Sequence, residues 1–312
     1  MKVGLVAGGA GFIGSNLCEF LLSRGWRIIC IDNLLTGSKE NIEHLIGHPR
    51  FKFLKRDITQ RFTVIGKLDV IFNLASPASP KDYHAYPLQT MTAGSLGTQN
   101  LLELARRKKA IFLHASTSEV YGDPEEHPQS ESYRGNVNPV GPRAVYDESK
   151  RYAEALIMAY YRIYRLPVRI VRIFNTYGPR MKLNDGRVIP NLISQALTSK
   201  PLTIYGTGKQ TRSFCYVSDL IKGLYKMIRC PEAEPINLGN PEEVSIIELA
   251  RLVKNLTRSK SPMRFLPIPA DEPKRRCPDI SQAKKLLNWE PKVSLTKGLT
   301  ITIKWFKNRI IV

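Results

Sequence analysis

Short apolar runs recur along the first half of the chain, and each is separated from the next by a stretch with helical spacing of apolar residues. The runs lie at 3–7, 27–32, 51–54, 68–75, 110–115 and 168–174. Continuous apolar runs of this length are typical of strands covered on both faces, and their alternation with helices is typical of a parallel sheet between helical layers. The pattern therefore predicts an α/β fold with a Rossmann-type, doubly wound parallel sheet.

The regular alternation of apolar runs and helical stretches ends near residue 178, after which loops and amphipathic helices predominate. The helices are expected over 188–200, 217–230 and 245–256. We therefore predict a sheet-forming domain at 1–178 and a smaller C-terminal α/β lobe at 179–312. The stretch 235–240 has the character of one more short strand, so segments of the second part are expected to return to the sheet.

Composition adds limits on protein class and compartment. The chain has 312 residues, of which 43% are hydrophobic, which suits an enzyme-sized core and excludes a disordered chain. Its five cysteines show no C-x-x-C spacing and several lie in apolar runs, which favours reduced thiols. No stretch approaches the roughly 18 apolar residues of a membrane span. Only Met1 and Lys2 precede the first run, so we expect a cytoplasmic protein without a signal peptide.

The formal net charge of +20 raises the question of a polyanionic partner. The basic residues are spread along the whole chain, with only short groups at 106–109 and 274–276, and no nucleic-acid-binding motif accompanies them. We therefore expect a solvated basic surface, with no nucleic acid and no membrane as partner. No metal is predicted.

A glycine-rich turn follows the first predicted strand. Residues 8–14 read GGAGFIG, which places Gly9, Gly11 and Gly14 in a G-x-G-x-x-G pattern before a stretch with helical spacing. Glycines there allow a tight turn and a close approach of the backbone to a pyrophosphate, which then lies at the positive end of the helix. Because a strand precedes the turn and a helix follows it, the pattern predicts a dinucleotide site.

Acidic residues after the next strands select among dinucleotides. Asp32 ends the second predicted strand, 18 residues after Gly14, and the carboxylate that binds ribose hydroxyls is expected at a spacing of about 20. It would repel the 2′-phosphate of NADP, so NAD is the predicted cofactor. Asp57, after the third strand, is either a turn residue or an acceptor for the adenine amino group. We expect cofactor contacts from Gly8, Gly11, Phe12, Ile13, Gly14, Asp32, Asn33, Asp57, Ile58 and Leu74.

Two groups of polar residues supply candidate chemistry. Thr117, Ser118 and Glu119 directly follow the fifth apolar run, so they are expected at the carboxyl end of a strand, where ligands bind in such sheets. Tyr146 and Lys150 stand four residues apart in a helical stretch and therefore share one face. A lysine ammonium near a phenol lowers the phenol pKa, as a base requires, although a surface Tyr and Lys at this spacing are common in any protein.

The glycine turn, Thr117, Tyr146 and Lys150 together resemble the extended short-chain dehydrogenase/reductase family, and the resemblance covers essentially the whole chain. Further segments resemble the UDP-glucuronate decarboxylases within it. These segments are 74–80, 115–155, 172–197, 205–220, 237–243 and 271–295. Sugar-nucleotide 4,6-dehydratases of the family carry Thr-Asp-Glu where this chain has Ser118 in the middle, so the acid for a departing hydroxyl is absent. Arg134 stands where the family commonly has Trp.

The resemblance implies a reaction and assigns residues to it. C4 of UDP-glucuronate would be oxidised with NAD, the resulting β-keto acid would lose carbon dioxide, and hydride return would give UDP-xylose. It implies that Tyr146 and Thr117 stabilise the enolate oxygen and that Glu119 orients the sugar or a proton-delivering water. It also implies that Arg276, in preference to Arg275, binds the carboxylate. The other implied contacts are Ser118, Asn175, Arg187, Tyr205, Gln210 and Arg212 for the nucleotide sugar, and Tyr146, Lys150 and Thr176 for the cofactor.

Two alternatives stay open on the sequence alone. One is a related NAD-dependent nucleotide-sugar 4-epimerase or 4,6-dehydratase; Ser118 speaks against the dehydratase and Arg276 against an epimerase of neutral sugars. The other is a catalytically silent NAD-binding protein, against which the retained Thr, Tyr and Lys speak. The resemblance also implies a homodimer packed through the helices near 95–108 and 148–165.

Overall fold

The computed structural model describes residues 1–268 and 275–310. Within these residues, seven parallel strands form one sheet in the order β11-β6-β5-β4-β1-β2-β3. The strands are β1 (Val3–Ala7), β2 (Arg27–Asp32), β3 (Phe51–Lys55), β4 (Val70–Asn73), β5 (Ile111–Thr117), β6 (Val168–Ile173) and β11 (Ile236–Leu238). The predicted Rossmann-type sheet is confirmed. Its order reverses between β1 and β4, which places the ligand crevice at the carboxyl ends of these strands.

Each apolar run of the first half forms a strand. β4 is shorter than predicted, whereas β5 is longer and ends at Thr117. The stretch 235–240 also returns to the sheet, because β11 pairs with β6 and places Ile236 opposite Val171. β11 therefore extends the sheet beyond β6 with a segment from the second half of the chain.

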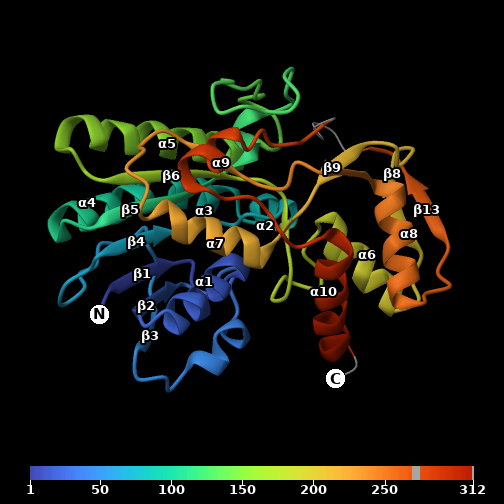
Figure 1. The fold of residues 1–312 in the computed structure, drawn as a ribbon, viewed down its shortest axis with the longest axis horizontal. Helices are drawn as coiled ribbons and strands as arrows, with labels where there is room; N and C mark the ends of the chain where they lie inside the picture. The colour runs from blue at the N-terminus through green and yellow to red at the C-terminus, as the bar shows by residue number, and fades with distance from the viewer. Residues whose placement is uncertain (269–274, 311–312) are drawn as a thin grey trace.

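Helices cover both faces of the sheet, as continuous apolar strands require. α1 (Phe12–Ser23) and α7 (Val217–Met227) lie on one face, and α4 (Thr98–Lys108) and α5 (Ala144–Tyr164) on the other (Figure 1). The apolar cores follow these layers, with Leu17 and Leu224 in one cluster and Leu101 and Ile157 in the other, all fully buried. Burial of a side chain of this size contributes roughly 1.5–3 kcal/mol.

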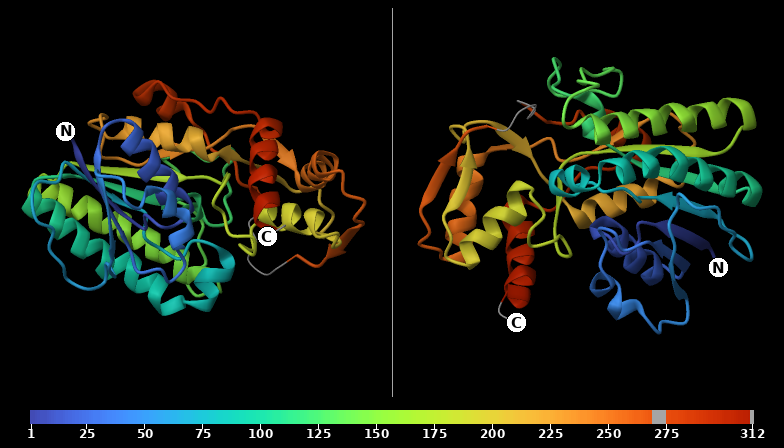
Figure 2. Two further views of the ribbon diagram at one scale, coloured as in Figure 1. Left: turned by 90° about the horizontal axis from the view of Figure 1, so that it is seen from below. Right: turned by 180° about the vertical axis from the view of Figure 1, so that it is seen from behind.

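A smaller lobe stands beside the sheet (Figures 1 and 2). It contains α6 (Val188–Leu197), β8 (Leu202–Tyr205), α8 (Ile246–Thr257), β13 (Met263–Leu266) and α10 (Leu295–Ile310). All three helices predicted for the second half are present, but α7 packs against α1 at the sheet. The second half thus supplies both the lobe and part of the sheet layers, and the division between 178 and 179 stays a prediction.

Short elements connect these layers near the carboxyl ends of the strands. They are η1 (Lys39–Asn41), η2 (Glu43–Leu45), α2 (Pro80–Ala85), α3 (Pro87–Thr92), η3 (Ala93–Gly97), η4 (Ser118–Tyr121), β7 (Thr176–Tyr177), β9 (Thr211–Ser213), β10 (Cys215–Tyr216), β12 (Glu243–Ser245) and α9 (Ser281–Leu287). Strand pairs form between β10 and β7, β12 and β9, and β13 and β8. Among the residues described, no helix has both the length and the apolar character to cross a bilayer.

Candidate active site

The glycine turn predicted to bind a pyrophosphate joins β1 to α1. Gly8 has a φ of 77°, and a Cβ there would lie 2.7 Å from the Leu74 backbone. A Cβ on Gly14 would lie 2.1 Å from the Gly8 carbonyl oxygen. Gly11 is the N-cap of α1 and supplies no side-chain cap. The first N–H groups of the helix are therefore available to an anion, as the sequence predicts.

Two carboxylates follow the neighbouring strands. Asp32 accepts hydrogen bonds from the backbone N–H of Ala10 at 3.0 Å and of Leu34 at 2.8 Å. Burial raises its pKa, and these two hydrogen bonds offset the rise in part. Asp57 accepts a hydrogen bond of 2.9 Å from the Asn33 amide. Burial tends to raise the pKa of Asp57, but hydrogen bonds from Thr59 and Asn33 outweigh it, so the pKa is lowered and the carboxyl group is ionised.

One pocket unites most of the predicted cofactor residues. It is lined by Gly8, Gly11, Asp32, Asn33, Asp57, Ile58 and Leu74, together with Arg56, Gln89 and Thr92. Phe12, Ile13 and Gly14 lie instead in the first turn of α1. The turn is too closely packed for side chains and leaves the helix N-terminus free, which fits the pyrophosphate of NAD. The carboxylate at the end of β2 fits the ribose.

The predicted catalytic Tyr and Thr meet at the carboxyl end of β5. Thr117 hydrogen-bonds to the phenol of Tyr146, and both residues are buried. Lys150 Nζ lies 5.8 Å from the centre of the Tyr146 ring and donates a hydrogen bond of 2.7 Å to the Ala115 carbonyl. Burial lowers the pKa of Lys150 to about 8, while the Glu154 carboxylate acts in the opposite direction.

The pKa of Tyr146 differs from the sequence-based expectation. Burial raises it, and the Thr117 hydrogen bond lowers it only in part. The Lys150 ammonium group donates its hydrogen bond to a backbone carbonyl and not to the phenol. The expected lowering of the Tyr146 pKa by lysine is therefore not observed. Tyr83 stacks on Tyr146 with ring centres 5.3 Å apart and planes 8° apart, which contributes to this burial.

Glu119 lies between two arginines beside this pair. Arg276 Nη1 donates to one of its carboxylate oxygens at 2.9 Å, and Arg143 donates to the other. Burial tends to raise the pKa of Glu119, but Arg276, Arg143 and the charge of Arg212 outweigh it, so the pKa is lowered. Arg276 Nη1 also donates to Ser118 Oγ at 3.2 Å. Arg276 thus lies beside the predicted catalytic residues, whereas Arg275 is exposed.

Three buried polar atoms around Glu119 have no hydrogen-bond partner among the described residues. They are Arg276 Nε, one oxygen of Asp147 and the Tyr83 hydroxyl. Glu119 influences the pKa of both Asp147 and Tyr83, which places all of them in one neighbourhood. Because an unpaired buried polar group is costly, this arrangement fits a site that receives a polar ligand.

The residues implied for the nucleotide sugar divide into two groups. Arg187 carries an ion pair with Asp185 and its charge reaches Tyr146, while Arg212 is buried on β9 and acts on Glu119. At the end of β8, Tyr205 is 42% exposed, and its carbonyl accepts a hydrogen bond of 2.6 Å from Gln210. The first group therefore lies near the predicted catalytic residues, and the second lies at the end of β8 in the lobe.

Asn175 and Thr176 connect the sheet to the lobe. The Asn175 carbonyl accepts a hydrogen bond of 2.9 Å from the Cys215 N–H, and Thr176 Oγ1 donates one of 2.8 Å to Phe174. Asn175 lies two residues after the end of β6 and Thr176 begins β7, at the carboxyl end of the sheet. Their position is consistent with the contacts that the sequence resemblance implies.

Four residues of this neighbourhood were not predicted from the sequence: Tyr83, Arg143, Asp147 and Asp185. Arg143 and Asp147 lie on the same helical stretch as Tyr146, within one turn of it, so helical spacing offered a signal for these two. Tyr83 on α2 and Asp185, in the segment before α6, lie far from Tyr146 in the sequence and offered none.

Comparisons with known proteins agree with this geometry. The family model described as GDP-mannose 4,6 dehydratase matches residues 5–302. UDP-glucuronic acid decarboxylase 1 of Arabidopsis thaliana is 51% identical over 307 residues, which cover 98% of this chain and 70% of that protein. The protein of the same name from Danio rerio is 50% identical over 306 residues, covering 98% and 73%.

Solved structures show the same fold at lower identity. A UDP-glucuronic acid 4-epimerase from Bacillus cereus, in complex with UDP-glucuronic acid and NAD, aligns with a TM-score of 0.86 at 31% identity and covers 99% of this chain and 100% of that one. A UDP-glucose 4-epimerase from Thermotoga maritima, with UDP-glucose, has a TM-score of 0.90 at 27% identity, with coverage of 99% and 100%.

Proposed function

The chain belongs to the GDP-mannose 4,6-dehydratase family of extended short-chain dehydrogenases/reductases, and from this premise we propose that it is an NAD-dependent UDP-glucuronate decarboxylase. The reaction converts UDP-glucuronate to UDP-xylose and carbon dioxide. The observation that carries this proposal is the group of arginines around Glu119, directly beside Thr117 and Tyr146.

The arginines supply the charge that a glucuronate carboxylate needs. Arg276 and Arg143 both donate hydrogen bonds to Glu119, and the positive charge of Arg212 also acts on this carboxylate. Arg276 keeps a free Nε donor, so it can bind an additional carboxylate without leaving Glu119. A neutral sugar would offer no charged acceptor to this Nε donor. The free donor of Arg276 therefore favours an acidic sugar.

Tyr146 and Thr117 carry out the proton transfers of the proposed reaction. NAD, when bound, accepts the hydride from C4 and later returns it. To act as the base, Tyr146 must first lose its phenol proton, which burial opposes and the positive charge of bound NAD would favour. The phenolate then takes the proton of the C4 hydroxyl, and Thr117 holds the ring oxygen in place through their hydrogen bond. After decarboxylation the negative charge develops on the C4 oxygen, where the protonated Tyr146 and Thr117 stabilise it. Glu119 is ionised and doubly paired, so it acts by orienting Arg276 and the sugar or a water that protonates C5.

The test is to incubate the purified protein with UDP-glucuronate and NAD and follow the sugar nucleotides by proton NMR. UDP-xylose without net accumulation of NADH is the expected result. A 4-keto pentose with accumulating NADH would show decarboxylation without hydride return. Unchanged UDP-glucuronate would contradict the proposal.

A 4-epimerase is the second candidate, because the Bacillus cereus relative with 31% identity carries that name together with UDP-glucuronic acid. Such an enzyme also needs positively charged side chains to bind the carboxylate of the sugar. The same NMR experiment separates the two, since an epimerase would produce UDP-galacturonate and release no carbon dioxide.

We further propose a cytoplasmic homodimer. The five cysteines are free and buried, which fits a reducing compartment. Large apolar side chains are exposed along α3, η3 and α5, among them Leu88 (74%), Leu96 (47%), Tyr152 (50%) and Ile163 (68%). Tyr152 and Ile163 are three helical turns apart and so share one face of α5. An exposed apolar face of this kind is typical of a protein–protein interface.

A further inference from the structure

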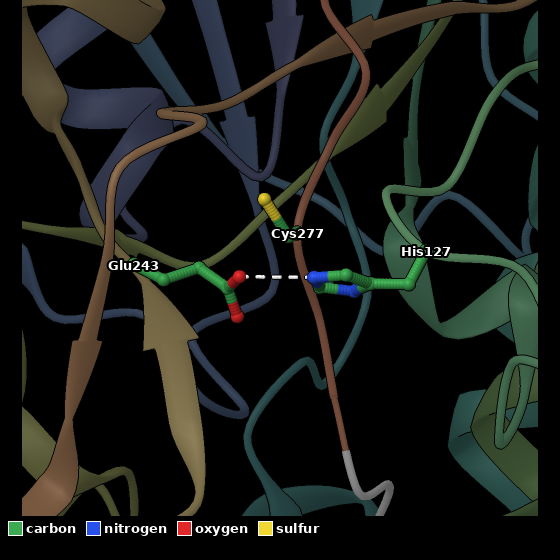
Figure 3. Close-up of side chains that lie close together, drawn as sticks. All are labelled: His127, Glu243 and Cys277. Carbon is green, nitrogen blue, oxygen red and sulfur yellow. Dashed lines mark hydrogen bonds and ion pairs between the residues drawn. The ribbon is translucent and has the colours of Figure 1, made fainter.

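A mixed group of potential metal ligands lies next to the segment that carries Arg276. His127, Glu243 and Cys277 come from three separate parts of the chain and converge (Figure 3). His127 Nε2 is 2.9 Å from a Glu243 carboxylate oxygen. One nitrogen, one carboxylate oxygen and the Cys277 sulfur all lie within 4.8 Å of one another. None of the three has a role in the proposed reaction.

The chemistry of this group favours zinc. Thiolate, imidazole and carboxylate are the ligand types of protein zinc sites, whereas Mg²⁺ and Ca²⁺ prefer oxygen ligands alone. Thr211 Oγ1 donates a hydrogen bond of 2.5 Å to the other Glu243 oxygen, which is the kind of outer contact that orients a ligand.

We propose that His127, Glu243 and Cys277 bind one Zn²⁺ per chain, with the fourth tetrahedral position open to water. Binding breaks the S–H bond of Cys277, and the proton leaves to solvent. The hydrogen bond between His127 and Glu243 is replaced by one bond from each residue to the metal. No oxidation or reduction takes place.

The position of the site indicates a structural role for the metal near Arg276 and Arg212. Cys277 directly follows Arg276, and its backbone already exchanges two hydrogen bonds with Gln129, at 2.9 and 2.8 Å. Glu243 lies on β12, which pairs with the strand that carries Arg212. A bound Zn²⁺ would therefore join the segments that carry both arginines. This consequence rests on the proposed function, but the binding of the metal does not.

The test measures metal binding by the full chain in the absence of substrate. After treatment with a chelator, the protein is titrated with Zn²⁺ by calorimetry and with Co²⁺ in an absorption spectrometer. We expect one tight Zn²⁺ per chain and, with Co²⁺, a thiolate-to-metal charge-transfer band. Cys277→Ser should remove this band and weaken Zn²⁺ binding by about tenfold or more. Because no substrate is present, failure of the proposed decarboxylation would leave this result untouched.

Matched variants keep the result interpretable. Cys230→Ser is the control, because Cys230 and Cys277 are both 5% exposed and Cys230 is not a member of the group. It should bind Zn²⁺ as the unchanged protein does. Glu243→Gln retains the shape of the side chain and should also weaken binding if Cys277→Ser fails to fold. Equal Zn²⁺ affinity in Cys277→Ser, Glu243→Gln and the unchanged protein would overturn the proposal.

Discussion

At the scale of single residues, the candidate active site is a set of buried charges that hold one another in place. Glu119 is ionised because Arg276 and Arg143 face its two carboxylate oxygens. Asp147 lacks such a partner for one oxygen, and burial together with the Glu119 charge raises its pKa to about 7. The site therefore combines one carboxylate that stays ionised with one that takes up a proton near neutrality.

Replacement of Tyr146 by phenylalanine is expected to abolish turnover and spare NAD binding. The variant keeps the ring that stacks on Tyr83 and loses only the hydroxyl that Thr117 contacts. Removal of a general base typically lowers the rate by about 10²–10⁴. The rate of UDP-glucuronate turnover and the affinity for NAD, measured on the same preparation, check this. Unchanged turnover would show that another group takes the proton.

Asp147→Asn is expected to stabilise the protein at alkaline pH more than at acidic pH. The pKa of Asp147 is higher in the folded than in the unfolded chain, so the folded state is favoured at low pH and loses stability as pH rises toward about 7. Asparagine does not ionise and avoids this loss. The melting temperature of the variant relative to the unchanged protein should therefore rise between about pH 5 and about pH 8.

Glu148→Gln serves as its control. Glu148 is the next residue, is only half-buried, and faces Arg151 at the surface at 3.6 Å. Its replacement should cause no comparable change with pH. A pH-independent difference for Asp147→Asn would argue against a raised pKa at this position.

At the scale of elements, the turn between β1 and α1 depends on the absence of side chains. The helix begins so close to the strand that a Cβ on Gly14 would approach the Gly8 carbonyl oxygen to 2.1 Å, whereas one on Gly11 would stay 3.2 Å away from it. The close approach of α1 to β1 is what leaves the helix N-terminus open toward a pyrophosphate.

Gly14→Ala is therefore expected to cost more stability than Gly11→Ala. The first forces α1 away from the strand, at a cost of about 1–3 kcal/mol for overpacking. The second places a methyl group in tight but tolerable contact and is expected to weaken NAD binding mainly by obstruction. Denaturant unfolding of both variants without cofactor measures the difference. Equal losses would show that the steric explanation is wrong.

At the scale of the whole molecule, the proposed dimer would cover apolar surface on η3 and α5, which contact each other. Ile163→Glu places a charge on that surface and should convert the dimer to a monomer, because burying an unpaired carboxylate is costly. Size-exclusion chromatography with light scattering measures the mass. Ile65→Glu is the control, since Ile65 is 99% exposed and lies outside these helices. A protein that is monomeric before substitution would refute the dimer.

The local pattern of residues was sufficient for the layered sheet, the glycine turn, Asp32 and the Tyr146–Lys150 pair. Each of these depends on contacts between residues close in the chain or on the period of apolar positions. The resemblance to a known family extended this to Arg276, which the fold places 2.9 Å from Glu119.

Only the tertiary structure decided the ionisation state of Glu119, the placement of Tyr83 on Tyr146 and the convergence of His127, Glu243 and Cys277. These residues come from elements far apart in the sequence, and no local pattern of residues indicates which of them meet. Their pKa values also depend on burial and on neighbouring charges, which exist only after the chain has folded. Short motifs were therefore sufficient to predict the reaction, whereas the pKa values of the site residues depend on the packing of distant segments.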